Sequence, residues 1–191
     1  SPMGLLASGD LDFVIQGERQ SYPPEYRLTT LGYAPPRLLV RAGHPLEGKK
    51  LTWDRLLEYP QVQLLIPELH EIQFHVPQDS SFIQRLTQVV PRLRTDHLPT
   101  AIRVVLNSDC VFPTPPLFMD EDDLSRGITT LPMPEGEELS ISYVLVSHER
   151  IAHSLTHDFL RQEILQVVEA FRLKYDLPGL AEMRAQRNLA Y

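Results

Sequence analysis

Three histidines, His148, His153 and His157, lie within the short stretch SHERIAHSLTH. His153 and His157 are four residues apart, so on a helix they would share a face, and imidazole nitrogens at that spacing can bind zinc. No HExxH motif is present and no cysteine lies nearby, so only Glu149 and Asp158 could add ligands. Polar histidines at the exposed start of a helix are the simpler interpretation, and the sequence predicts no metal site here.

Two other residues have side chains that could take part in a reaction, but each has a structural explanation. Cys110 lies in the apolar run DCVFP, where a free cysteine usually behaves as a small buried hydrophobe rather than as a nucleophile. His44 precedes Pro45, and this proline already accounts for the end of the strand before it. We therefore assign both residues structural roles.

The motifs that bind common cofactors are absent from the sequence. It contains no phosphate-binding loop, no dinucleotide fingerprint and no GxSxG elbow. The acidic cluster Asp120–Asp123 lacks the spacing of a calcium-binding loop and is interpreted as a solvated turn. We expect no cofactor, no catalytic residue and no resident metal.

Polar residues at strand ends and helix starts are better candidates. In open α/β folds ligands bind beyond the carboxyl ends of strands, where Gln16 and Gly17 follow an apolar run. Ser80 and Ser81 begin an expected helix whose free N–H groups could hold an anion. The alternative, which stays open, is that Asp79 or Ser80 only caps that helix.

These residues need elements to position them, and the composition indicates an ordinary globular protein. Of 191 residues, 42% are hydrophobic and 23% are charged, which suffices for a core. The 17 prolines fall between apolar runs and indicate many short elements. No run is long enough to span a membrane, one cysteine forbids an internal disulfide, and no export signal is visible, so the sequence predicts a cytoplasmic protein.

Strands and helices are expected to alternate. Gly9 should end an N-terminal helix, and Leu11–Ile15 should form a strand covered on both faces. Thr52 should cap a short helix over 53–58 that Pro60 stops. The remaining predicted strands cover 37–42, 62–66, 92–95, 109–113, 128–131 and 139–147, with 72–76 a short strand or loop. Helices are predicted over 81–90, 99–106 and 155–174, the last amphipathic, and the pattern favours an α/β fold with largely parallel sheets.

Four stretches together resemble the effector-binding domain of LysR-type transcriptional regulators. They are LLASGDLDFVI, LLVRAGHPLEGKKLTWDRLLEYPQV, SDCVFPTPP, and SYVLVSHER followed by THDFLRQEI. Their order and spacing match that family over about residues 3–173. The resemblance implies a two-lobed fold of the type II periplasmic-binding-protein kind, with two hinge-crossing strands and an effector cleft between the lobes.

This resemblance also implies a division of the chain and further site residues. Subdomain I is expected to comprise residues 1–60 and 143–174, subdomain II residues 61–142, and a C-terminal tail residues 175–191. Four more residues match positions that line the cleft in the family, namely Thr95, His97, Thr100 and Phe112.

Two parts of the family pattern are missing from the sequence. No helix-turn-helix is present, which agrees with the net charge of −7, so DNA should be bound only through a domain outside this chain. The first β-α-β unit of the effector domain also has no counterpart. The remaining partners implied are a small organic acid or aromatic effector and a second or further copy of the chain, as homodimer or tetramer, with no membrane.

Two other functions stay open from the sequence alone. A solute-binding protein would share the two-lobed architecture, although no export signal supports it. An enzyme on the same scaffold is the third alternative, because a fold does not determine function. The residues upstream would separate the first two alternatives, since they would carry either a helix-turn-helix or a signal peptide.

Overall fold

The computed structural model describes residues 1–66, 69–75, 84–85, 88–114, 126–134 and 140–174. The chain forms two compact units. Unit 1 contains residues 1–34, 70–74 and 141–191, and unit 2 contains residues 35–69 and 75–140. Among the described residues, no helix is long and apolar enough to cross a membrane.

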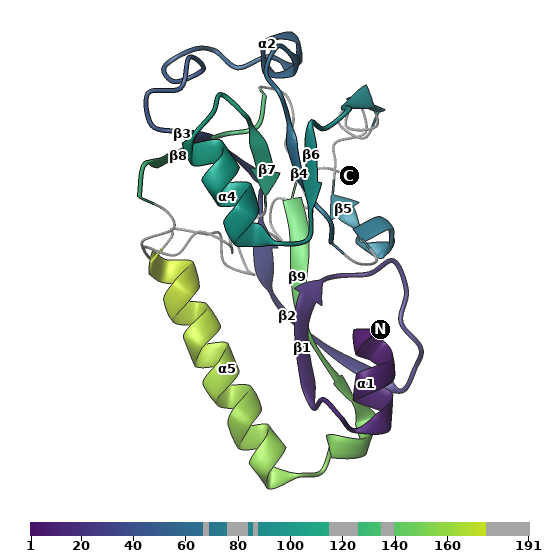
Figure 1. Cartoon of the computed structure of the whole chain (residues 1–191). Coiled ribbons are helices and arrows are strands. Elements are labelled where there is room, and N and C mark those ends of the chain that lie inside the picture. Colours follow the sequence, from purple (N-terminus) through teal and green to yellow (C-terminus); the bar gives the residue numbers. More distant parts are fainter. Residues whose placement is uncertain (67–68, 76–83, 86–87, 115–125, 135–139, 175–191) are drawn as a thin grey trace, which may run out of the picture. The chain divides into compact units, whose positions relative to one another are not determined.

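Unit 1 is organised around β9 (Ser140–His148), the return strand predicted over 139–147 (Figure 1). β1 (Phe13–Gly17) and β2 (Tyr26–Ala34) lie on either side of β9 and both pair with it antiparallel. The short strand β5 (Phe74–His75) also pairs with β9. β9 therefore lies between two earlier strands, and its pairings with both of them are antiparallel.

Most pairings in the described residues are antiparallel, so the prediction of largely parallel sheets is wrong. β4 (Val62–Leu64) and β6 (Leu93–Thr95) form a parallel ladder. The sequence pattern reports the alternation of strands and helices, but not the insertion of a late strand between two early ones. The α/β class itself is confirmed.

Two helices pack on unit 1. α1 (Pro2–Ser8) ends at Gly9, whose φ of 89° is left-handed, as predicted for a glycine C-cap. Leu6 of α1 is fully buried against Val144 and Val146 of β9. α5 (Leu155–Lys174) has the bounds predicted from the sequence.

The predicted burial of two elements in unit 1 is wrong. Ile15 of β1 is 51% exposed, so this strand is not covered on both faces. No residue of α5 is buried, and Phe159 of its predicted apolar stripe is 66% exposed. Periodicity identifies a face of a helix, but it does not determine how much protein lies against that face.

Unit 2 contains a three-stranded antiparallel sheet with β3 (Arg37–Arg41) between β7 (Phe112–Thr114) and β8 (Ile128–Leu131). α4 (Leu98–Leu106) packs on β3, β4 and β6. The apolar core that α4 forms with these strands contains Leu39, Val62, Ala101, Ile102, Val105, Cys110 and Phe112. Because β3 pairs on both edges with strands of unit 2, the contacts group residues 35–60 with unit 2, whereas the sequence places them in subdomain I.

The connecting elements agree in part with the sequence. α2 (Trp53–Leu57) begins after Thr52, whose hydroxyl accepts a hydrogen bond from the Arg55 amide at 3.3 Å, as predicted for its cap. The 3₁₀ turns are η1 (Leu69–Glu71) and η3 (Glu149–Ile151). Half of the predicted helix over 81–90 lies outside the described residues, and Asp120–Asp123 and the tail 175–191 lie wholly outside them.

Candidate functional site

The end of β1 in unit 1 carries the first two predicted site residues. The Gln16 side-chain amide donates to the Tyr22 hydroxyl at 3.0 Å, and the same hydroxyl accepts from the Arg19 amide at 3.1 Å. These bonds hold the loop after β1 beside the strand end. Gln16 is half-buried, so its side chain is already oriented by the protein.

Gly17 is required by a close approach of the chain. A Cβ atom at this position would lie 2.9 Å from Cγ2 of Ile72 and 3.3 Å from Cγ2 of Ile141. Real Cβ atoms essentially never show the shorter of these separations. Gly17 therefore lets residues 70–74 pack against the end of β1, and its role in this structure is steric.

Ser142, which the sequence analysis did not identify, lies next to this strand end. It is fully buried in β9, and its hydroxyl has no hydrogen-bond partner among the described residues. The backbone carbonyl of Ser142 accepts from the Glu18 amide at 2.7 Å, so the residue lies directly across from the end of β1. A serine within the apolar run LSISYVLVS gives no sequence signal for such a site.

Three predicted site residues are brought together in unit 2, at the start of α4. The His97 amide donates to the Thr95 hydroxyl at 3.1 Å, and Nδ1 of His97 lies 2.9 Å from the Thr100 hydroxyl. All three precede or begin α4, where unpaired backbone N–H groups favour an acceptor or an anion. The resemblance therefore selected residues that are in mutual contact here.

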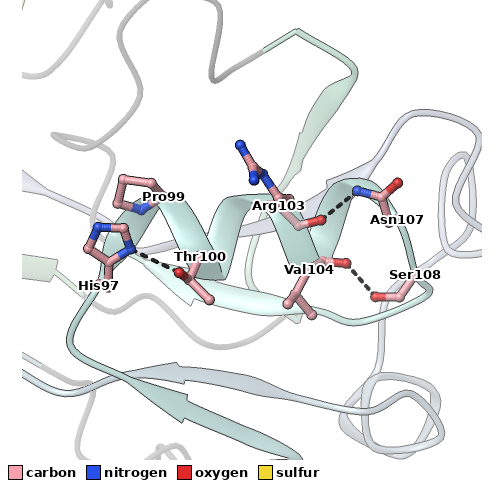
Figure 2. A pocket seen from close by; sticks show the side chains of 7 residues that line it. All are labelled: His97, Pro99, Thr100, Arg103, Val104, Asn107 and Ser108. Atoms are coloured by element: carbon pink, nitrogen blue, oxygen red, sulfur yellow. Dashed lines mark hydrogen bonds between the residues drawn. The ribbon is translucent and has the colours of Figure 1, made fainter.

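A groove of about 460 Å³ runs along the outer side of α4 and includes two of these residues (Figure 2). Figure 2 shows its side chains in a row along the helix, with Arg103 adding one positive charge. Asn107 and Ser108 close the groove by bonding the carbonyls of Arg103 and Val104 at 2.8 and 2.7 Å. The residues that line it are His97, Pro99, Thr100, Arg103, Val104, Asn107 and Ser108.

The remaining predicted site residues are not on an accessible surface that the structure describes. Phe112 is fully buried in the core of unit 2, because β7 lies beneath α4. Ser80 and Ser81, with the competing cap Asp79, lie outside the described residues. A ligand-binding role for each of them stays a prediction.

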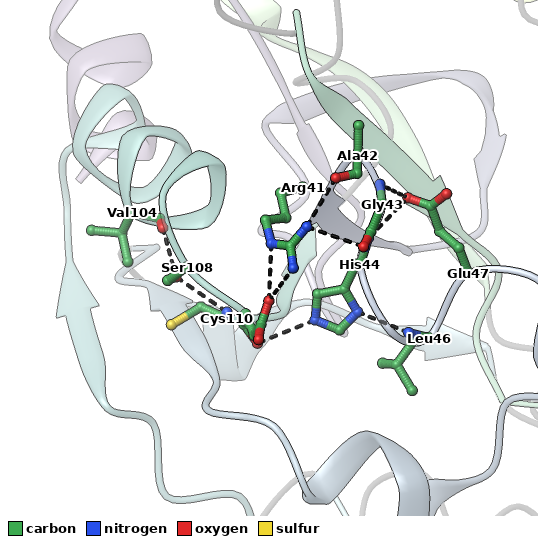
Figure 3. Close-up of polar contacts among 10 residues, drawn as sticks. Arg41, Ala42, Gly43, His44, Leu46, Glu47, Val104, Ser108 and Cys110 are labelled. Carbon is green, nitrogen blue, oxygen red and sulfur yellow. Dashed lines mark hydrogen bonds and ion pairs between the residues drawn. The ribbon is translucent and has the colours of Figure 1, made fainter.

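His44 has the structural role assigned to it. The Leu46 amide donates to Nδ1 of His44 at 3.1 Å, which requires that nitrogen to be unprotonated. Nε2 then carries the proton and donates to the carbonyl of Asp109 at 3.2 Å. Figure 3 shows this ring between two segments of unit 2, beside Arg41, which pairs with Asp109 at 2.7 Å. The turn formed by His44, Pro45 and Leu46, called the HPL turn, is thus tied to the segment between α4 and β7.

The histidine cluster also has protein partners. Nδ1 of His148 accepts from the Arg150 amide at 3.2 Å, while Nε2 of His157 lies 3.2 Å from Oδ2 of Asp12. Arg150 binds the other carboxylate oxygen of Asp12 at 2.8 Å. The hydrogen bonds from Arg150 and then from His157 lower the pKa of Asp12. These contacts join the start of α5 to the segment between α1 and β1.

Within the described residues no group of three or more His, Cys, Asp or Glu side chains is arranged to hold a metal ion. Burial raises the pKa of Tyr143, the neighbour of Ser142 in β9. The polar groups named at the strand ends and along α4 are hydroxyls, side-chain amides, the His97 imidazole and the guanidinium groups of Arg19 and Arg103. This set can bind and orient a small polar molecule.

Comparison with known proteins finds a family model that matches most of this chain. The model of the LysR substrate binding domain matches residues 1–169. None of the curated proteins matches the sequence.

Several solved structures share the fold. A transcriptional regulator from Pseudomonas aeruginosa is 17% identical with a TM-score of 0.59, covering 88% of this chain and 52% of its own. Reduced OxyR from N. meningitidis is 21% identical with a TM-score of 0.62, covering 86% and 74%. The regulatory domain of MexT, a transcriptional activator in Pseudomonas aeruginosa, is 15% identical with a TM-score of 0.61, covering 85% and 77%. The chain thus spans about half the length of the first of these proteins.

Proposed function

The chain belongs to the LysR substrate-binding domain family, and from that premise we propose that it binds a small-molecule effector on behalf of a DNA-binding transcriptional regulator. The match of the family model to residues 1–169 carries the proposal. The two compact units, each with polar side chains at the end of a strand or the start of a helix, support it.

The proposed effector is a small organic acid or an aromatic compound. The candidate contacts are Gln16 at the end of β1 in unit 1, or Thr95, His97 and Thr100 before α4 in unit 2. A ligand that makes different contacts in two conformations of the protein can shift the population between them. That differential contact would transmit binding to the rest of the regulator.

We propose a binding role without catalysis, in the cytoplasm, with DNA bound through another domain. Two solved structures that share the fold are named a probable transcriptional regulator and a transcriptional activator, which favours this role over a solute-binding protein or an enzyme. Self-association is part of the proposal, with α4 and β7 meeting a second copy. The net charge of −7 supports the absence of direct DNA binding by this chain.

Thermal unfolding with a panel of organic acids and aromatic compounds tests the proposal. A compound present at 100 times its Kd stabilises the folded state by about 2.7 kcal/mol and should raise Tm by about 5–10 °C. Thr100→Val keeps the side-chain shape and should reduce that shift, whereas Thr29→Val on β2 should not. A compound whose affinity does not change on substitution of Gln16, His97 or Thr100 would leave the family assignment intact. It would place the binding site elsewhere in the chain.

A further inference from the structure

Strand β2 of unit 1 contains a β-bulge close to the point where the chain enters unit 2. Residues 26–30 pair with β9 in one register, and residues 32–34 pair with it in a register shifted by one residue (Figure 1). The extra residue, Leu31, has no partner in this ladder. The boundary between the units follows at once, between Ala34 and Pro35. Because a bulge bends its strand, it sets the direction in which β2 leaves unit 1.

Gly32 provides the backbone conformation of this bulge. Its φ is +152°, which L side chains rarely adopt, yet a Cβ atom there would meet no atom within 4 Å. Gly32 is therefore required by the backbone and not by crowding, in contrast to Gly17, whose Cβ would collide with Ile72. A glycine in open space can change its backbone angles without moving a packed neighbour.

The residues between Gly32 and unit 2 have less freedom. Ala34 is 1% exposed and pairs with Ile141 of β9. Pro35 and Pro36 follow it, and their rings hold φ at about −65°. The backbone freedom nearest to the boundary on this strand therefore lies at Gly32.

Ser142 of β9 lies at the same step of the ladder. It pairs with Tyr33, one residue beyond the bulge, and it is fully buried. Its hydroxyl has no hydrogen-bond partner in the part of the chain that the structure describes. A buried hydroxyl without a partner costs free energy. This raises the free energy of the bulged conformation relative to any conformation in which the hydroxyl is bonded.

We propose that the bulge at Leu31 and Gly32 is a pivot, at which a change of the Gly32 backbone moves the end of β2, and unit 2 with it, between two populated conformations. The unbonded hydroxyl of Ser142 narrows the free-energy difference between them. The other passages of the chain between the units, at 69/70, 74/75 and 140/141, must follow this motion. The inference goes beyond the proposed function, because the motion needs no effector, although an effector that favours one conformation would use it.

Distances between spin labels in the two units test the proposal. The labels are attached to Gln162→Cys in α5 and Glu58→Cys after α2, both exposed positions, in a Cys110→Ala background. Double electron–electron resonance should show two distances in the otherwise wild-type chain.

Two substitutions should shift these populations in opposite directions. Gly32→Ala should lower the share of the bulged conformation about tenfold, because alanine disfavours this φ. Ser142→Ala should raise that share about fivefold, because it removes the unbonded hydroxyl. If Gly32→Ala does not fold, the shift caused by Ser142→Ala decides.

Gly48→Ala is the matched control. Gly48 also has a positive φ, of 69°, and open space at its Cβ position, but it lies in unit 2 away from the boundary. This change should leave both distances and their shares unchanged. A single distance that is the same in all variants would overturn the proposal, and so would an equal shift by Gly48→Ala. Because no effector is used, either failure would leave the proposed function untouched.

Discussion

At the scale of single residues, His44 shows how a side chain with catalytic potential serves the fold. Its ring is 2% exposed, accepts one backbone hydrogen bond, donates another and packs 4.7 Å from the ring of Tyr59. The bond that Nδ1 accepts requires a neutral ring, and the partners of both ring nitrogens are backbone groups. His44 therefore fixes the HPL turn to the segment that leads into β7.

His44→Ala should lower the free energy of unfolding by about 2–3 kcal/mol, since it leaves a cavity and two unpaired backbone groups. His153→Ala, at an exposed position before α5, is the matched control and should change it by less than about 0.5 kcal/mol. Urea denaturation measures both. Equal effects of the two changes would contradict the structural role of His44.

The contacts of Asp12 predict how the stability of the chain depends on pH. Its pKa is lowered in the folded state by Arg150 and His157, so its contribution is present above the unfolded pKa of about 4 and is lost as pH falls through the folded pKa. The stability of the wild-type chain relative to Asp12→Asn should therefore shrink in acid. Urea midpoints of the two proteins between pH 3 and 7 measure this, and a constant difference would contradict it.

At the scale of elements, the packing of residues 70–74 against the end of β1 depends on Gly17. Gly17→Ala should lower the free energy of unfolding by about 1–3 kcal/mol, because Ile72 and Ile141 must move to accept a methyl group. Gly4→Ala in α1 meets no atom within 4 Å and should be stabilising by about 0.5–1 kcal/mol. Thermal unfolding of both variants measures the difference in stability. If both substitutions are destabilising, the contact of a Cβ with Ile72 and Ile141 is not the cause.

Local signals explain what the sequence could predict. The Gly9 cap, the Thr52 cap and the bounds of α5 each depend on residues within a turn or two, and all are observed. β2 was missed because YRLTTLGYA follows two prolines and alternates poorly. The buried hydroxyl of Ser142, the core position of Phe112 and the insertion of β9 depend on pairing between distant segments, which no local pattern reports.

At the scale of the whole molecule, association should be weak and should use the face of α4. Val104→Lys adds a charge within the groove on that helix and should abolish any concentration-dependent rise in mass. Val167→Lys, at a 69% exposed position on α5, should leave it unchanged. Sedimentation across a concentration series measures both, and a tight dimer that survives Val104→Lys would assign association to another surface.

The central claim is that this chain binds a small effector, and calorimetric titration of the wild-type chain with organic acids and aromatic compounds tests it most directly. We expect at least one compound to bind at a single site, and either Gln16→Ala or Thr100→Val to weaken its binding, because these residues are the proposed contacts. A folded chain that binds no compound of either class would contradict the account.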